Sequence, residues 1–451
     1  MKVVSCQLSV VSKFFVLTFV ILSSISANFA QTNAVSPEKA ITEFEVNGLK
    51  VIIKRRPSSP TVSAGLFTRG GVKNQTAENA GIESLTLSTA AESSKKFPRE
   101  VLRKELSRTG SVIGAGMSYD FGVTSLTSTR QNFDRTWEIF TDVVLNPSFT
   151  SADFQRVREL TLAGLRNRTI SPDGSLESLE EKIVYAKHSY ENDPSGTIET
   201  IGKLKIEDLQ AYHKNLLQTS RLLLVIVGDL EPEVVKKQIT DSFGKLPRGD
   251  YKEPTTQRIN FAQPTVDVTE RAIPTNYIKG IFSAPSLNDP DYYAMRVAMS
   301  VLGSRVYEEV RVKRNLSYAP GAEMGEKSAN TANISVSTND ANQSISMMLN
   351  EIGNLKKEEV SENEFARISG GFLTRHYIDQ ETNAAQVSEL ARYELFGGGW
   401  RNSLTFLDKI KQVKAKDIQT VSNKYMKNIR FVVIGNPAAV NRSVFLSGAQ
   451  N

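Results

Sequence analysis

The sequence predicts an α+β protein made of two homologous, duplicated α/β-sandwich domains. Three observations predict this class. The chain of 451 residues is too long for one ordinary core. A segment near the end of the first half is repeated near the end of the second, and strands and amphipathic helices are segregated rather than alternating along the chain. A hydrophobic content of 40% and a charged content of 23% exclude a disordered chain.

The repeat pairs Ile201–Arg221 with Ile410–Arg430 without a gap, so that Asp208 aligns with Asp417 and Arg221 with Arg430. Each copy predicts a helix with an acidic first turn, followed by a buried strand that ends in glycine. Because the match is long and stands at the same place in each half, it indicates a duplicated domain.

The predicted boundary between the domains lies in the proline-containing segment Leu246–Pro274, which lacks a helical period. We therefore expect a first domain at 38–248, a linker at 249–264 and a second domain at 265–445. An Asn47-Gly48 step between two short apolar runs predicts a type I′ hairpin at the start of the first domain. Further strands are expected at Thr61–Thr68 and Tyr277–Phe282, and helices at Phe133–Leu145 and Ala152–Asn167.

Residues 1–30 are expected to be a signal peptide. Lys2 and Lys13 precede the apolar run Phe14–Leu22, and small residues follow it. An uncleaved anchor is the alternative, although the run is short for a bilayer span. The only cysteine is Cys6, so the processed chain would have no thiol, which excludes cysteine catalysis and disulfides. We expect an exported protein, periplasmic or otherwise extracytoplasmic, without a later membrane span.

The formal net charge of +6 is modest, and basic residues are scattered among acidic ones. Nucleic-acid binders gather their basic residues into a patch or stripe. The distribution of charge therefore argues against a nucleic-acid partner.

The stretch from Glu43 to Glu92 combines the Asn-Gly hairpin, a central strand, a glycine turn and a helix that begins at Gly81-Ile82. This order resembles the opening of the insulinase/pitrilysin family of zinc peptidases. The resemblance implies two LuxS-like, processing-peptidase-like domains joined by the linker into a clamshell. In active members the helix carries His-x-x-Glu-His, in which the two histidines bind zinc and the glutamate is the general base.

Aligning Gly81-Ile82 with the family pattern places Ser84, Leu87 and Ser88 at the three motif positions, and Gly164 at the third zinc ligand. Serine is a poor zinc ligand, leucine cannot accept a proton and glycine has no side chain. The only histidines are His188, His213 and His376, which are far apart in sequence. We therefore expect no metal in this chain and treat these positions as degenerate. No histidine or Gly-x-Ser-x-Gly turn supports either serine as a nucleophile.

The segment Ser304–Tyr318 resembles the family's second-domain motif, an arginine followed seven residues later by a tyrosine. The resemblance implies that Arg311 and Tyr318 bind substrate carbonyls and stabilise the oxyanion beside zinc. In two-subunit members, one subunit holds the zinc and the other supplies this pair. The alternative is that Arg311 pairs with Glu308 or Glu309 and that Tyr318 is a strand residue at a core edge.

The resemblance implies a non-catalytic subunit of a heteromeric zinc metallopeptidase that acts in trans through Arg311 and Tyr318. Its partner would be a zinc-bearing subunit of the same family, and its substrates would be peptides. The edge strand expected at Ile113–Ser118 has Gly114-Ala115 where active relatives carry Asn-Ala, which weakens substrate pairing there. The alternative function is a non-enzymatic peptide-binding or assembly scaffold, and no residue constellation supports an independent enzyme.

Overall fold

The computed structural model describes residues 37–447, so the predicted signal peptide at 1–30 lies outside the described residues. A 3-10 helix at Pro37–Ala40 precedes Ile41, and from Ile41 onward the chain is one compact unit. Within residues 37–447, no helix combines the length and hydropathy that crossing a bilayer requires.

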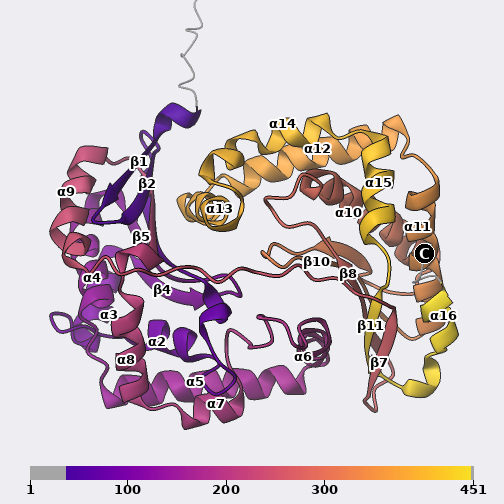
Figure 1. Cartoon of the computed structure of the whole chain (residues 1–451), viewed down its shortest axis with the longest axis horizontal. Coiled ribbons are helices and arrows are strands. Elements are labelled where there is room, and N and C mark those ends of the chain that lie inside the picture. Colours follow the sequence, from indigo (N-terminus) through magenta and orange to yellow (C-terminus); the bar gives the residue numbers. More distant parts are fainter. Residues whose placement is uncertain (1–36, 448–451) are drawn as a thin grey trace, which may run out of the picture. The chain divides into compact units, whose positions relative to one another are not determined.

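The first sheet has six strands in the order β1-β2-β6-β3-β5-β4. Its strands β1, β2, β4 and β5 are labelled on the left of Figure 1. Strands β2 and β6 are parallel, and all other neighbours are antiparallel. Asn47 and Gly48 have φ values of 50° and 85°, as the predicted type I′ turn requires. The strands are β1 (Ile41–Val46), β2 (Leu49–Arg55), β3 (Thr61–Arg69), β4 (Val112–Met117), β5 (Phe121–Thr129) and β6 (Leu222–Gly228).

The second sheet has five strands in the order β7-β11-β8-β10-β9, and only β7 and β11 are parallel. This order repeats β2-β6-β3-β5-β4 of the first sheet, with the parallel pair at the same place. The predicted duplication is therefore confirmed in the topology. The strands are β7 (Thr265–Glu270), β8 (Asn276–Ser283), β9 (Gly321–Met324), β10 (Thr331–Thr338) and β11 (Arg430–Gly435).

The repeated segment forms the same local structure twice. Helices α8 (Ile206–Leu216) and α15 (Ala415–Tyr425) each have 11 residues and lead into β6 and β11. The backbone N–H of Lys205 donates to the Asp208 carboxylate at 2.8 Å, and that of Lys414 donates to Asp417 at 2.9 Å. A carboxylate in the first turn thus satisfies an N–H at the start of each helix.

The remaining helices pack around the two sheets (Figure 1). In the first half they are α2 (Ile82–Ala90), α3 (Arg99–Thr109), α4 (Phe133–Leu145), α5 (Ser151–Ile170), α6 (Pro172–Val184), α7 (Ile198–Lys203) and α9 (Pro232–Ser242). In the second half they are α10 (Tyr292–Val306), α11 (Ala341–Lys357), α12 (Glu362–Asp379), α13 (Asn383–Phe396), α14 (Phe406–Gln412) and α16 (Arg442–Ser447).

Each sheet is covered on one face by helices of its own half and on the other by a helix of the opposite half. Helix α13 packs on β3 and β6, and helix α6 packs on β8 and β11. The first contact buries Leu223, Val225 and Val227 of β6 against Val387 and Leu390. The central strands are therefore buried on both faces, which explains their continuous apolar runs.

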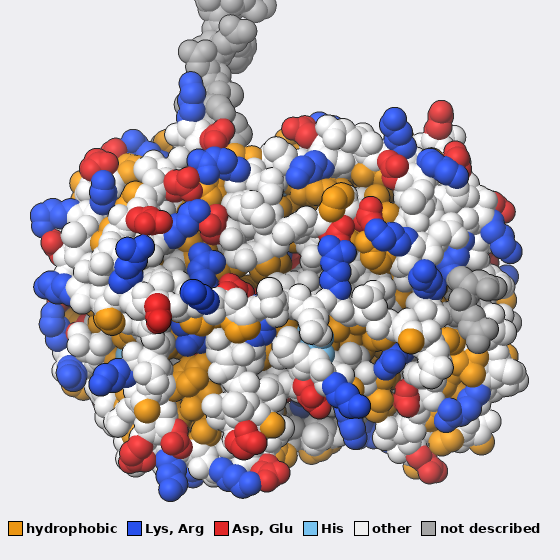
Figure 2. All heavy atoms as spheres, in the orientation of Figure 1, with side chains coloured by type: hydrophobic (Ala, Val, Ile, Leu, Met, Phe, Trp, Pro, Cys, Tyr) orange, Lys and Arg blue, Asp and Glu red, His pale blue; other side chains and the backbone are white. Residues whose placement is uncertain are grey.

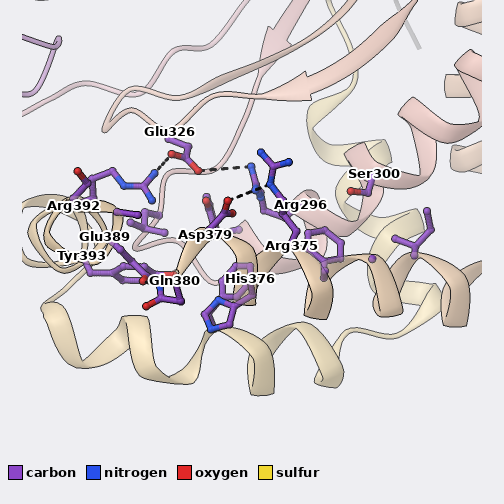
Figure 3. Close-up of a pocket in the computed structure, with 18 of the residues that line it drawn as sticks. Arg296, Ser300, Glu326, Arg375, His376, Asp379, Gln380, Glu389, Arg392 and Tyr393 are labelled. Atoms are coloured by element: carbon purple, nitrogen blue, oxygen red, sulfur yellow. Dashed lines mark hydrogen bonds and ion pairs between the residues drawn. The ribbon is translucent and has the colours of Figure 1, made fainter. Parts of the chain in front are cut away.

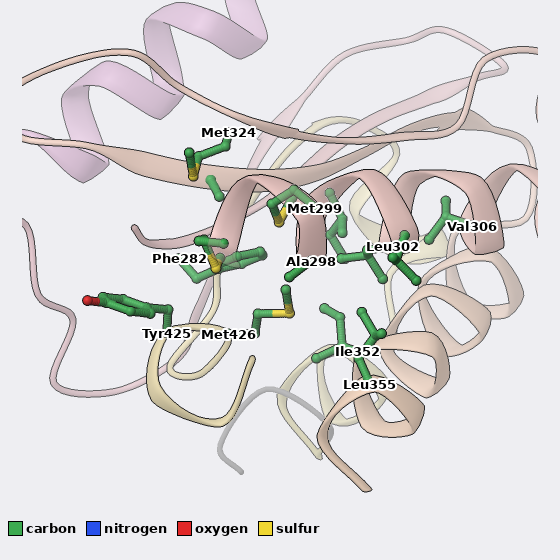
Figure 4. Packing of buried hydrophobic residues seen from close by; sticks show 14 of the residues in the cluster. Phe282, Ala298, Met299, Leu302, Val306, Met324, Ile352, Leu355, Tyr425 and Met426 are labelled. Atoms are coloured by element: carbon green, nitrogen blue, oxygen red, sulfur yellow. The ribbon is translucent and has the colours of Figure 1, made fainter. Parts of the chain in front are cut away.

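The main core of the second half lies between α10, α11 and β8 (Figure 4). Ala298, Met299 and Leu302 on one side of α10 meet Phe282 and Ile352. This packing leaves the opposite side of α10 available to line a cavity, which is described below.

The predicted linker, residues 249–264, contains no helix or strand. It contributes one aromatic ring to each of the repeated arginines. The Arg221 guanidinium lies 5.2 Å from the Tyr251 ring centroid, and that of Arg430 lies 4.7 Å from the centroid of Phe261. These cation–π contacts tie the linker to both copies of the repeat.

Candidate functional site

Helix α2 carries the positions that correspond to the family's metal motif. It begins after Gly81, whose φ of 87° suits glycine, and packs against α5, α8 and the first sheet. Leu87 is only 5% exposed and belongs to the core with Leu66 and Phe140. Ser84 and Ser88 are half-buried.

Gly164 lies on α5, where it is exposed and a Cβ atom would meet nothing within 4 Å. An apolar core residue, two neutral hydroxyls and a glycine do not fit zinc. Among residues 37–447, no group of three or more His, Cys, Asp or Glu side chains is arranged to hold a metal ion.

The polar residue that α2 does use is Glu83, which is fully buried. Its carboxylate accepts hydrogen bonds from the Thr68 hydroxyl, from the Tyr212 hydroxyl at 2.6 Å and from the Arg221 guanidinium at 2.8 Å. Burial raises the pKa of the Glu83 carboxyl, and Arg221 is the largest opposing influence. This network was not predicted. The only sequence signal for it is a lone carboxylate within an apolar helix.

The three histidines lie on different elements and have structural contacts. His213 on α8 is buried beside the Val144 carbonyl, with Nε2 at 2.9 Å, and burial lowers its pKa. His188 follows α6 and contacts the Gln257 carbonyl. His376 on α12 stacks on Phe406 with the ring centroids 5.6 Å apart.

Arg311 and Tyr318 lie together where α10 ends. The helix continues into a π-helical turn, Tyr307–Val312, and Asn315 then reverses the chain with a φ of 51°. The Arg311 guanidinium lies over the Tyr318 ring, 4.8 Å from its centroid, and donates to Asn315 Oδ1 at 2.7 Å. Single π-helical turns are frequent at functional sites.

The structure differs from the alternative interpretation of this pair. Glu309 binds Lys313 and Arg314, and within the described part of the chain no carboxylate lies at ion-pair distance from Arg311. Tyr318 precedes β9 in a loop and is 80% exposed, so it is not a strand residue at a core edge. The phenol therefore faces solvent, and the Arg311 guanidinium beside it is half-buried.

Two further features affect ligand access. Strand β4 (Val112–Met117) forms one edge of the first sheet, in agreement with the predicted edge strand, and Val112 is 64% exposed. On the face shown in Figure 2, Lys and Arg side chains are interspersed with Asp and Glu. No stripe of one charge crosses that face.

Two family models match the chain. The model for insulinase (peptidase family M16) matches residues 50–193, and the model for the peptidase M16 inactive domain matches residues 203–370. The chain belongs to the insulinase family. The predicted family and fold class are confirmed, while the domain boundaries and the roles of the site residues stay predictions.

Among curated relatives, the chain is similar to the "Non-peptidase homolog YmxG" of Helicobacter pylori, with 21% identity over 88% of this chain and 94% of that protein. It is 22% identical to the bovine "Cytochrome b-c1 complex subunit 1, mitochondrial" over 62% of this chain, which spans only 58% of the bovine protein.

Solved structures share the fold. A protease from Helicobacter pylori superposes with a TM-score of 0.81 at 19% identity, covering 88% of this chain and 99% of that one. The first half of the periplasmic protease PqqL from Escherichia coli superposes with a TM-score of 0.74 at 15% identity, covering 92% and 97%.

Proposed function

We propose that this protein is an exported, non-catalytic subunit of a heteromeric zinc peptidase that places Arg311 and Tyr318 in the active site of its partner. The observation that carries the proposal is the contrast between the two helices. Helix α2 offers no metal ligands at the motif positions, whereas a half-buried guanidinium and an exposed phenol lie together where α10 ends. The similarity to a protein named a non-peptidase homologue and to one named a complex subunit supports it. Export is supported by the likeness to a periplasmic protease.

The pair is suited to binding a peptide carbonyl as negative charge develops on its oxygen. The guanidinium offers several N–H donors in a fixed plane, and the phenol offers one O–H donor. Because Asn315 and the Tyr318 ring both contact Arg311, the guanidinium is held in place before a substrate arrives. Such preorganised donors contribute most where charge appears in the transition state. Zinc, expected in the partner, would supply the activated water.

A scaffold that binds peptides or assembles a complex without assisting catalysis is the second candidate. It is supported by the similarity to a cytochrome b-c1 complex subunit. In that case the shared architecture would be retained, and Arg311 and Tyr318 would not be needed for turnover by the complex.

Kinetics of the assembled complex separate the two functions. The partner, a family member that carries His-x-x-Glu-His, would be captured from the native host with this chain as bait. Tyr318→Phe removes one donor and keeps the ring, so we expect the kcat of the complex to fall by about 10²–10³-fold. Arg311→Lys should also lower kcat, because an ammonium cannot reproduce the planar fork.

The matched control is Tyr377→Phe, which removes the phenol of another exposed tyrosine, 63% exposed on α12, and should leave kcat unchanged. Metal analysis of this chain alone should give less than one zinc per molecule after dialysis. Full activity in the Tyr318→Phe complex would leave the protein as a scaffold.

A further inference from the structure

A cavity of about 900 Å³ lies in the second half between α10, α12 and α13 (Figure 3). On α10 it is lined by Tyr292, Arg296, Ser300 and Ser304, which are four residues apart and share one side of the helix. Residue Glu326, in the loop between β9 and β10, reaches into the cavity from the opposite side. The function proposed above makes no use of this cavity.

The charged residues of the cavity come from separate elements. Four arginines line it, one from α10, two from α12 and one from α13, together with three carboxyl side chains. Arg375 is paired with Asp379 on the same helix, and the two side chains point toward each other in Figure 3. The full set is Arg296, Arg367, Arg375, Arg392, Glu326, Asp379 and Glu389. Because burial raises the pKa of Glu389 to about 7, the four arginines outnumber the ionised carboxylates at neutral pH, which suits an anionic ligand.

Two of the arginines converge on one carboxylate. Arg392 forms an ion pair with Glu326, and the Arg296 guanidinium lies 3.9 Å from the other Glu326 oxygen. The Nε atoms of Arg296 and Arg392 are buried without a hydrogen-bond partner in the described structure. Burial lowers the pKa of Arg392, as expected for a cation that has lost water. Buried N–H groups without acceptors are costly, so the pair is under-satisfied by Glu326 alone.

The Glu326 side chain is itself 42% exposed and stands on a loop, and its interactions with the two arginines hold it in the cavity. We propose that Arg296 and Arg392 form a binding site for the carboxylate of a peptide, and that Glu326 is the chain's own competitor for it. This inference rests on the proposed function, because peptides are the substrate class proposed there. The carboxylate is either the peptide C-terminus or an acidic side chain, and the two sources can be separated by capping.

The rest of the cavity suits the residues that adjoin the carboxylate. Phe372 and Phe406 supply apolar walls, while Ser300 and Ser304 supply hydroxyls along α10. A cavity of this size falls within the usual range for ligand sites. A multiply charged phosphate fits less well, since the Asp379 carboxylate lines the same space and would repel it.

Calorimetric titration of the isolated chain with tetra-alanine tests the proposal. The peptide with a free C-terminus should bind, and its C-terminal amide should bind at least about thirtyfold more weakly. Arg392→Met and Arg296→Met should each cause a comparable loss. Glu326→Gln should strengthen binding several-fold, because it removes the competing charge and lies on a half-exposed loop where folding is unaffected.

Acetyl-Ala-Glu-Ala-amide and its glutamine counterpart test for an acidic side chain as the source. Arg305→Gln is the matched control, since it removes a guanidinium from the same helix that pairs with Glu364 instead. Equal binding of all acids and amides, or unchanged affinity in both Glu326→Gln and the arginine variants, would overturn the site. Because the titration uses neither zinc nor partner, such a result leaves the kinetic test of Arg311 and Tyr318 intact.

Discussion

Helices α2 and α10 follow equivalent central strands, β3 and β8, in the two sheets, yet they use their polar residues in opposite ways. On α2 the ionisable group is Glu83, fully buried and supplied with three donors by β3, α8 and the segment before β6. On α10 the polar residues line an open cavity, and the helix is followed by half-buried Arg311 and exposed Tyr318. One copy of the duplicated element has become core, and the other keeps polar groups accessible to ligands.

The two regions also differ in how their buried arginines are paired with other groups. Arg221 has a buried carboxylate and two aromatic rings around it, so it is compensated within the fold. Arg296 and Arg392 share one half-exposed carboxylate and keep buried N–H groups without acceptors. Compensation inside the fold favours stability, whereas incomplete compensation beside a cavity favours an external anion.

The largest expected effect is on stability, at the buried network around Glu83. Glu83→Ala leaves Arg221 buried without its counter-charge, and breaking such a pair costs about 3–5 kcal/mol of unfolding free energy. Urea denaturation measures the loss. As a control, Glu199→Ala on α7 removes an exposed partner of Lys203 and should leave the midpoint unchanged. If Glu83→Ala also left the urea midpoint unchanged, the network would not stabilise the fold around α2.

A smaller effect is expected at Glu389, which lines the cavity on α13. Burial raises the pKa of this carboxyl from its usual 4.5 to about 7, with Lys54 opposing and Asp379 reinforcing the shift. The folded protein therefore keeps a proton that the unfolded chain has already released. Stability contributed by the protonated form is complete below about pH 4.5 and is lost as the pH rises through about 7.

Glu389→Gln cannot ionise, so it does not lose this stability as the pH rises. The unfolding free energy of the variant minus that of the unsubstituted protein should therefore be about 1–3 kcal/mol larger at pH 8 than at pH 4.5. The Gln380 amide that binds Glu389 can still find an acceptor in the new side chain. Urea titrations of both proteins at the two pH values give the difference. An equal gap at both values would show that folding does not raise the pKa of Glu389.

Local features were predictable from the sequence, and features assembled from distant segments were not. The Asn47-Gly48 turn and the repeated helix starts at Lys205 and Lys414 depend on neighbouring residues only. The Arg311–Tyr318 contact also spans just seven positions. In contrast, the partners of Glu83 come from three separate elements, and Arg296, Glu326 and Arg392 meet only after α10 and α13 have packed. No periodicity or motif marks such a meeting in advance.

The smallest expected effect concerns the stability role of Arg311. Arg221 and Arg311 both lie over a tyrosine ring, but the first is buried and the second stands beside a phenol that is 80% exposed. An exposed cation–π contact contributes about 0.5–1 kcal/mol, so Arg311→Met should cost no more than that, whereas Arg221→Met should cost several kcal/mol. Tyr318→Phe keeps the ring and should change stability even less. If Arg311→Met lowered the unfolding free energy in urea as much as Arg221→Met, the Arg311–Tyr318 pair would contribute substantially to the stability of the fold. Its exposure would then no longer indicate a role in binding substrate, because a group retained for ligand contact can be removed at little cost to folding.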